Sequence, residues 1–205
     1  DIDLADTAFP HMALRVGRIC GVPCRLFRVS FTGELGFEIN VPANYGKAVW
    51  DALYAHGAPM GLTPYGTEAM HILRAEKGYI IVGQDTDGTV TPQDAGLSWA
   101  IAKSKPDFVG IRGLKRVDLV AEGRKQLVGL KTKDPKTVLE EGAQIVLDPN
   151  QPIPMKMVGH VTSSYWSENC GRSIAMGLVE GGFEKMGQTI YVPMPDRVIE
   201  AEICD

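Results

Sequence analysis

The second half of this sequence alternates short apolar stretches with turn residues, and this pattern strongly limits the fold. Gly, Pro, Asp and Asn clusters separate the stretches. Five or six short strands in about 80 residues are typical of a small antiparallel barrel. The expected strands are residues 126–132, 143–147, 158–164, 173–179, 189–192 and 198–203.

The first half has mixed periodicity and predicts both strands and helices. Residues 25–31 and 37–41 alternate like the two strands of a hairpin. Apolar residues at helical spacing predict helices over 45–56, capped by Asn44, and over 64–77, starting at Thr63-Pro64. Three weaker predictions are a strand at 79–83, a strand or extended segment at 94–102 and a helix at 113–121.

A polar break at Gly123-Arg124-Lys125 separates the two patterns. We therefore expect an α+β protein with one domain over residues 1–123 and a barrel domain over residues 124–205.

Composition narrows the functional classes. The chain has 205 residues, 44% of them apolar, with a net charge of −4. This charge disfavours a nucleic-acid partner or an anionic membrane. No apolar run reaches the roughly 18 residues that span a bilayer. The chain starts at Asp1 without a visible signal peptide, so we expect a piece of a longer protein.

The cysteines and histidines predict no metal site. Three residues separate Cys20 from Cys24, and no second pair or nearby histidine completes a zinc set. The expectation is reduced, partly buried thiols in a cytoplasmic protein.

Two carboxylates flank a Gly-x-x-Gly bend in the hairpin, in the run Thr32-Gly33-Glu34-Leu35-Gly36-Phe37-Glu38. Glu38 stands between apolar residues, so on a half-buried strand it faces away from both neighbours. Local pattern favours a solvated outer-face residue. The alternative is a side chain that the glycine bend directs into a pocket.

This motif is similar to the folate-site signature of the aminomethyltransferase family, the T-protein of glycine cleavage. Three further segments strengthen the likeness: 62–78, 83–92 and 159–175. The first two segments resemble the alpha subunit of heterotetrameric sarcosine oxidase more than T-protein itself, and the third resembles the C-terminal barrel that both share. The resemblance implies the C-terminal part of a T-protein-like folate-binding fold followed by its barrel.

The resemblance also implies roles for three residues. Glu38 matches the glutamate that holds the pterin edge, and Arg74 matches an arginine that contacts folate. Phe31 stands where T-protein usually has a tyrosine near the folate, so a ring is kept and a hydroxyl is lost. The alternative for Arg74 is a cation that complements the helix dipole, and the alternative for Phe31 is a plain core aromatic.

The implied activity is that of an enzyme fragment, with tetrahydrofolate as cofactor. The parent would oxidise sarcosine, and the imine from its methyl group would be captured as 5,10-methylenetetrahydrofolate. The family's aspartate base is expected upstream of Asp1, so no catalytic residue is assigned here. Flavin and NAD are expected elsewhere in the parent assembly, whose other subunits would be the partners.

Two alternatives remain open at this point. One is a stand-alone T-protein or a dimethylglycine oxidase-like protein. The other is a non-catalytic folate-binding or subunit-assembly module without turnover of its own.

Overall fold

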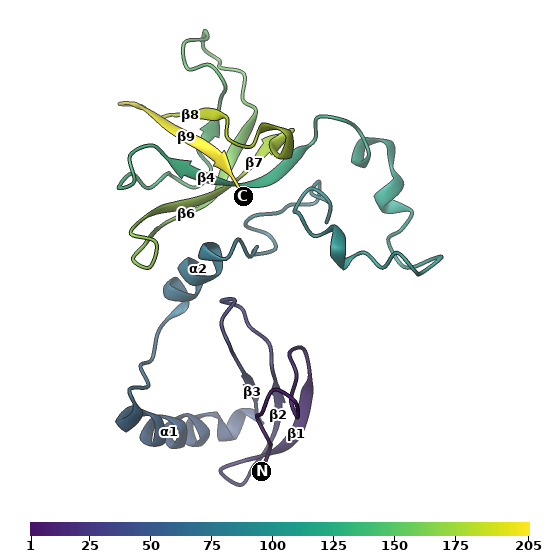
Figure 1. Cartoon of the computed structure of the whole chain (residues 1–205), viewed down its shortest axis with the longest axis vertical. Helices are drawn as coiled ribbons and strands as arrows, with labels where there is room; N and C mark the ends of the chain where they lie inside the picture. The colour runs from purple at the N-terminus through teal and green to yellow at the C-terminus, as the bar shows by residue number, and fades with distance from the viewer. The chain divides into compact units, whose positions relative to one another are not determined.

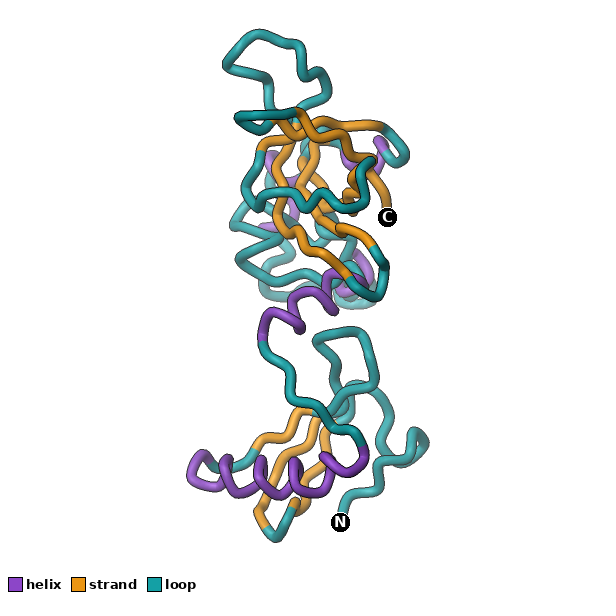
Figure 2. The backbone as a smooth tube through the Cα atoms, turned by 90° about the vertical axis from the view of Figure 1, so that its left-hand side faces the viewer, coloured by secondary structure: helices purple, strands orange, loops and turns teal.

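The protein divides into two compact units, which are described separately. The structure, a computed structural model, describes residues 1–205, and the units are Asp1–Tyr79 and Ile80–Asp205. Figure 1 labels the helices and strands, and Figure 2 distinguishes them from the long loops. No helix in the chain combines the length and apolar character that crossing a bilayer demands.

The first unit contains a three-stranded antiparallel sheet and two helices. The strands are β1 (Leu14–Ile19), β2 (Val22–Phe27) and β3 (Glu38–Asn40), in the order β1-β2-β3. Cys20 and Gly21 join β1 to β2, and both have positive φ angles, 51° and 77°. Two such residues form the tight turn whose twist matches that of paired strands. The helical elements of this unit are η1 (Ala43–Tyr45), α1 (Gly46–Gly57), η2 (Ala58–Met60) and α2 (Thr67–Glu76).

One face of the first sheet is buried. Val22, Cys24 and Leu26 are buried, and the intervening residues of β2 are exposed. Phe9 is fully buried, and its ring centroid lies 5.8 Å from that of Phe37. The alternation of buried and exposed residues along β2 is the period-two pattern of a half-buried strand.

The second unit begins with irregular chain and ends in a six-stranded sheet of order β5-β6-β7-β4-β9-β8. Val146 and Tyr191 exchange both backbone hydrogen bonds, at 2.9 and 3.0 Å. This pair joins the end of β5 to β8, so the sheet closes and the predicted antiparallel barrel is confirmed. Its strands are β4 (Lys125–Thr132), β5 (Gln144–Ile145), β6 (Gly159–Ser167), β7 (Arg172–Glu180), β8 (Thr189–Pro193) and β9 (Val198–Cys204). The short helical turns of this unit are η3 (Ser98–Ala100), η4 (Gly113–Lys115), η5 (Val117–Leu119) and η6 (Gly182–Lys185).

Aliphatic side chains from every barrel strand fill the interior. Such a core excludes water and fixes the register, because a one-residue slip would expose the apolar set of a strand. The core members are Val128, Leu130, Leu139, Ile145, Val158, Val161, Ala175, Val179, Ile190, Val192, Ile199, Ala201 and Ile203.

Several predicted elements are wrong in type. Residues 79–83 form no strand: Val82 makes only an isolated bridge, and a turn follows it, in which the carbonyl of Ile81 accepts from the amides of Gln84 and Asp85. Residues 94–102 contain turns and η3 where a strand was expected. The helix predicted over 113–121 is two short turns, because Arg116 between them is extended at ψ 144°.

Two predicted helix starts are also wrong. Tyr45, not Asn44, occupies the N-cap of α1, and no side chain caps that end. The second helix begins at Thr67, three residues beyond Pro64, with Gly66 at its N-cap.

Asp85 anchors the start of the second unit to the barrel. Its fully buried carboxylate accepts from the hydroxyls of Thr162 and Ser163, each at 2.6 Å, and from the amide of Ile81 at 2.9 Å. Consecutive residues of a regular strand point to opposite faces. The irregularity in β6 between Val161 and Ser163 allows two adjacent hydroxyls to reach one carboxylate.

We expect Asp85→Ala to lower the free energy of unfolding by about 3 kcal/mol, because two buried hydroxyls would lose their acceptor. Urea unfolding followed by circular dichroism measures this change. Asp148→Ala is the matched control, since exposed Asp148 accepts only the amide of Asn150 and should cost less than about 1 kcal/mol. Equal losses in the two variants would contradict the anchoring role.

A second buried carboxylate closes the irregular segment that precedes β4. Asp94 accepts from Nε of Arg124 at 3.1 Å and from its Nη2 at 2.5 Å. Arg124 also donates to the carbonyls of Thr89 and Asp118. The two ends of residues 95–123 are therefore held together by one ion pair.

This pair should make the second unit sensitive to acid. Burial by itself would raise the pKa of Asp94, but hydrogen bonds from Arg124 and Thr91 outweigh it and hold the pKa below its ordinary value of 3.8. A carboxyl group whose pKa is lower in the folded than in the unfolded state stabilises the fold at pH values above its unfolded-state pKa. This stabilisation is lost as the pH falls through the folded-state pKa. We expect Asp94→Asn to lower the melting temperature at pH 7, with a difference from wild type that shrinks below about pH 4. A thermal melt at each pH measures it, and a constant difference would contradict the assignment.

Candidate functional site

Glu38 opens β3 on the exposed face of the first sheet. It pairs with Phe27, which in turn pairs with Leu14 of β1, so these residues share one face. Leu14 and Val16 on that face are 44% and 76% exposed. The Glu38 carboxylate is exposed and has no hydrogen bond or ion pair within the chain. It is therefore a free acceptor on a sheet face that also exposes apolar side chains.

The loop between β2 and β3 is held at both ends. Arg28 donates to the carbonyl of Phe9 and pairs with Asp6, both at 2.6 Å. Its guanidinium also lies 6.0 Å from the ring centroid of Phe37. Phe31 lies in this loop with 43% of its surface exposed, so its ring is available to a ligand.

The glycine turn of this loop lies against the end of α2. Gly33 has a φ of +80°, and a Cβ built on it would lie 2.6 Å from Cγ of Lys77. The next residue, Glu34, forms an ion pair with Nζ of Lys77 at 2.9 Å. A hydrogen bond from Lys77 to Glu34 raises the lysine pKa. The loop and the helix end are thus joined by a close backbone approach and a surface pair.

Arg74 sits where α2 terminates. Gly78, at φ +69°, donates to the carbonyl of Ala75, and Tyr79 donates to that of Arg74. This is the Schellman pattern, which needs a left-handed residue after the helix. The Arg74 side chain is fully buried and donates from Nη1 to the Tyr79 carbonyl at 3.0 Å. A buried guanidinium is therefore fixed one turn from the helix end.

The three predicted residues lie in the first unit, on the loop between β2 and β3, on β3 and on α2, and they do not bond to one another. Glu38 and Phe31 flank the turn that touches Lys77, and Arg74 precedes Lys77 by three residues. The sequence analysis missed Lys77, because its partner Glu34 is 43 residues away in the chain. It also gave Asp85 no role, because no local signal marks the burial of that carboxylate.

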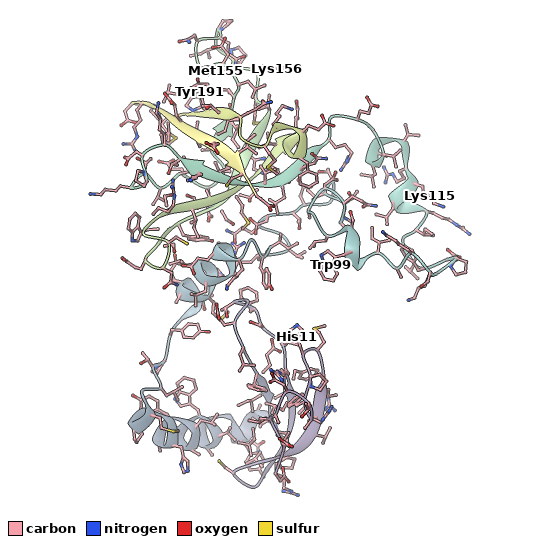
Figure 3. All side chains as sticks on the ribbon, in the orientation of Figure 1. His11, Trp99, Lys115, Met155, Lys156 and Tyr191 are labelled. Carbon is pink, nitrogen blue, oxygen red and sulfur yellow. The ribbon has the colours of Figure 1, made fainter.

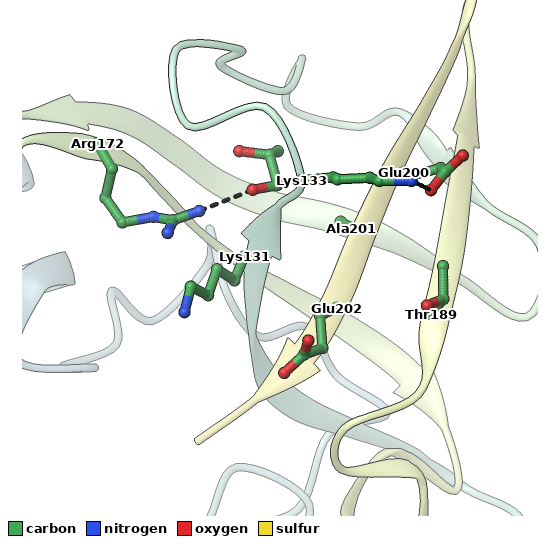
Figure 4. A pocket seen from close by; sticks show the side chains of 8 residues that line it. Lys131, Lys133, Arg172, Thr189, Glu200, Ala201 and Glu202 are labelled. Atoms are coloured by element: carbon green, nitrogen blue, oxygen red, sulfur yellow. Dashed lines mark hydrogen bonds and ion pairs between the residues drawn. The ribbon is translucent and has the colours of Figure 1, made fainter.

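The barrel carries a pocket of about 300 Å³ with paired charges (Figure 4). Lys133 pairs with Glu200 at 2.7 Å, and Arg172 donates to the carbonyl of Thr132 at 2.7 Å. Lys131 stands opposite Glu202 on the neighbouring strand. Lys131 and Lys133 face carboxylates of the same pocket, and Arg172 leaves it a net charge of only +1 to select a ligand.

A second pocket, of about 260 Å³, lies on α1 in the first unit and is apolar. None of Glu38, Phe31 and Arg74 lines either pocket. The lining residues are Trp50, Leu53, Tyr54, Leu62, Thr63, Pro64 and Tyr65.

We expect Gly33→Ala to destabilise the first unit by roughly 1–2 kcal/mol, because alanine is strained at positive φ and would press on Lys77. Gly46→Ala is the matched control. Gly46 has helical angles and open space around it, so alanine there should be neutral or slightly stabilising. Thermal melts of both variants test this, and equal shifts would contradict the close approach.

Comparisons with known proteins agree with this architecture. The model of the GCVT N-terminal domain matches residues 1–105, and that of the glycine cleavage T-protein C-terminal barrel domain matches residues 125–205. The crystal structure of glycine cleavage system aminomethyltransferase T from Bartonella henselae is similar, with a TM-score of 0.76 and 25% identity. That likeness covers 89% of this chain and 48% of the other.

Sequence relatives fall into two groups. Sarcosine oxidase subunit alpha from Corynebacterium sp. (strain U-96) is 44% identical over 100% of this chain and 21% of its own length. The subunit from Rhizobium meliloti is 38% identical over 94% of this chain and 20% of its own. Aminomethyltransferase from Desulforamulus reducens is 32% identical over 91% of this chain and 49% of its own. The chain thus spans about a fifth of the first group and about half of the second, and by its two domain matches it belongs to the glycine cleavage T-protein family.

Proposed function

We propose that this chain forms one wall of a tetrahydrofolate site in a sarcosine oxidase alpha subunit, with Glu38, Arg74 and Phe31 in contact with the folate. In the parent enzyme, the one-carbon unit released from the N-methyl group of sarcosine would pass to tetrahydrofolate at this site. The 44% identity to a sarcosine oxidase alpha subunit, against 32% to an aminomethyltransferase, supports the oxidase over a stand-alone T-protein.

Glu38 is the observation that carries the proposal. A reduced pterin presents an N–H and an amino group side by side, and one carboxylate can accept from both. The Glu38 carboxylate has no competing partner in the chain and lies on a sheet face that also exposes Leu14 and Val16. The residue therefore fits the polar edge of a flat ligand whose faces need apolar contact.

Phe31 and Arg74 fit complementary parts of such a ligand. An exposed phenyl ring can stack on a pterin or an aminobenzoyl ring, and this needs no hydroxyl. Arg74 supplies a guanidinium, and its buried position strengthens the electrostatic effect of that group on an anionic part of a ligand.

Bound tetrahydrofolate would supply the amine that accepts the one-carbon unit. The residues of this chain would orient it: Glu38 by its hydrogen bonds, Phe31 by its ring. Exclusion of water matters because water competes for the one-carbon unit. The proton-handling aspartate, the flavin and the NAD belong, in this proposal, to other parts of the parent assembly in the cytoplasm.

We also infer that the folate domain ends at residue 123 and that the barrel domain starts at residue 124. The first barrel strand begins at Lys125, which supports this division. The compact units divide earlier, at residues 79 and 80, because Asp85 and Asp94 bond to residues on the barrel side.

The test is calorimetric titration with folinic acid, a stable reduced folate. We expect Glu38→Gln to weaken binding by about 2 kcal/mol, or roughly thirtyfold, because the amide cannot accept both bonds. Glu140→Gln, an exposed barrel substitution, is the matched control and should leave the dissociation constant unchanged.

An unchanged affinity in Glu38→Gln would refute the pterin contact. If the 205-residue chain binds no folinic acid, the same pair of substitutions is compared in the full-length protein that contains it. Absence of binding there would refute the folate site and leave a module for assembly alone.

A further inference from the structure

Residues Trp99–Val120 form an exposed segment rich in cations, which we call the basic segment. It follows Asp94 and ends before Arg124, and in Figure 1 it leaves the sheet as a long excursion before β4. It holds five cations against two carboxylates, Asp107 and Asp118. All five cations are exposed: Lys103, Lys105, Arg112, Lys115 and Arg116.

The charge of this segment opposes that of the rest of the chain. Its net charge is +3, and since the whole chain carries −4, the remaining residues carry −7. Arg116 pairs with Asp118 within the segment. Arg112 and Lys115 have no side-chain partner in the chain. A concentrated positive patch on an acidic protein attracts an acidic partner to this place and not elsewhere.

Apolar side chains stand among these cations. Trp99 is 80% exposed, and Val117 and Val120 are 86% and 62% exposed. Figure 3 labels Trp99 and Lys115 on this segment. Tryptophan and arginine are the residues most often found at the energetic centre of protein interfaces.

The segment is held at its base. The ion pair between Asp94 and Arg124 closes its two ends, and Arg124 also donates to the carbonyl of Asp118. Backbone hydrogen bonds stabilise its turns, such as that from Leu114 to the carbonyl of Gly110. A surface whose ends are fixed loses less entropy on binding than a free tail.

We infer that the basic segment is a docking surface for an acidic protein surface, with Trp99 as the apolar anchor and Arg112 and Lys115 as the charge contacts. The exposed valines favour a protein over a nucleic acid, because single-stranded nucleic acids bind through repeated aromatic stacking. The negative charge of the remaining chain also repels a long polyanion. This inference concerns a surface apart from Glu38, Phe31 and Arg74 and stands without the proposed function.

The test uses two synthetic 20-residue peptides, one of glutamate and leucine and one of lysine and leucine, and a thymidine 30-mer. We expect the protein to bind the acidic peptide, more weakly as salt is raised, and not the basic one. The double variant R112E/K115E should lose binding by about tenfold or more, since both contacts become repulsive. Trp99→Ser should also weaken it. Biolayer interferometry gives the dissociation constants.

Lys156→Glu is the matched control, because Lys156 is an exposed lysine on a barrel loop (Figure 3). Its effect should stay within about twofold. Tighter binding of the thymidine 30-mer than of the acidic peptide would overturn the choice of a protein partner. Self-association in sedimentation that R112E/K115E removes would reassign the surface to a second copy of this chain. Absence of binding to the acidic peptide, or equal loss in Lys156→Glu, would refute the inference.

Discussion

The close approach of Gly33 to Lys77 is the constraint on which the candidate site depends. The ion pair between Glu34 and Lys77 lies in solvent, and exposed pairs contribute little to stability. The close packing at Gly33 constrains the loop more strongly than this ion pair. A side chain at position 33 would meet the stem of Lys77 and would also be strained at φ +80°. Two glycines with left-handed angles, Gly33 in the loop and Gly78 after α2, therefore set how the Glu38 loop meets the helix that carries Arg74.

The second unit uses buried polar groups in a different way. Its barrel core is aliphatic and closes on itself, so it needs no polar contact to form. Asp85 and Asp94 instead attach the irregular chain before β4 to that barrel and to its first strand. Hydrogen bonds and ion pairs of this kind are directional, and a buried carboxylate without its partners is costly. They fix one arrangement of a segment whose buried residues are polar, namely Asp85, Thr91 and Asp94.

The sequence predictions are accurate where local patterns determine the structure and fail where contacts between distant residues determine it. The barrel strands were predicted close to their observed bounds because their period and turn residues are local signals. The body of α1 was predicted equally well. The segment at 94–102 was wrong because Trp99 has the propensity of a strand residue but no neighbouring strand to pair with. The helix at 113–121 failed because Arg116 is extended. The contact of Glu34 with Lys77 and the burial of Asp85 depend on residues distant in the chain, which no local pattern reveals.

The position of Glu38 bears on both interpretations of its motif, a solvated outer-face residue and a residue that contacts a ligand. Local pattern favoured an outer-face residue, and the carboxylate does lie on the exposed face of β3. That face, however, also exposes Leu14 and Val16, and exposed aliphatic residues on a sheet indicate a surface that contacts something other than water. A carboxylate with no partner costs nothing in water, so the fold alone gives no reason to place one directly after a loop that is pinned at both ends. The pinned loop and the exposed apolar side chains of this face are both compatible with the proposed ligand, a flat molecule with adjacent donors on one edge.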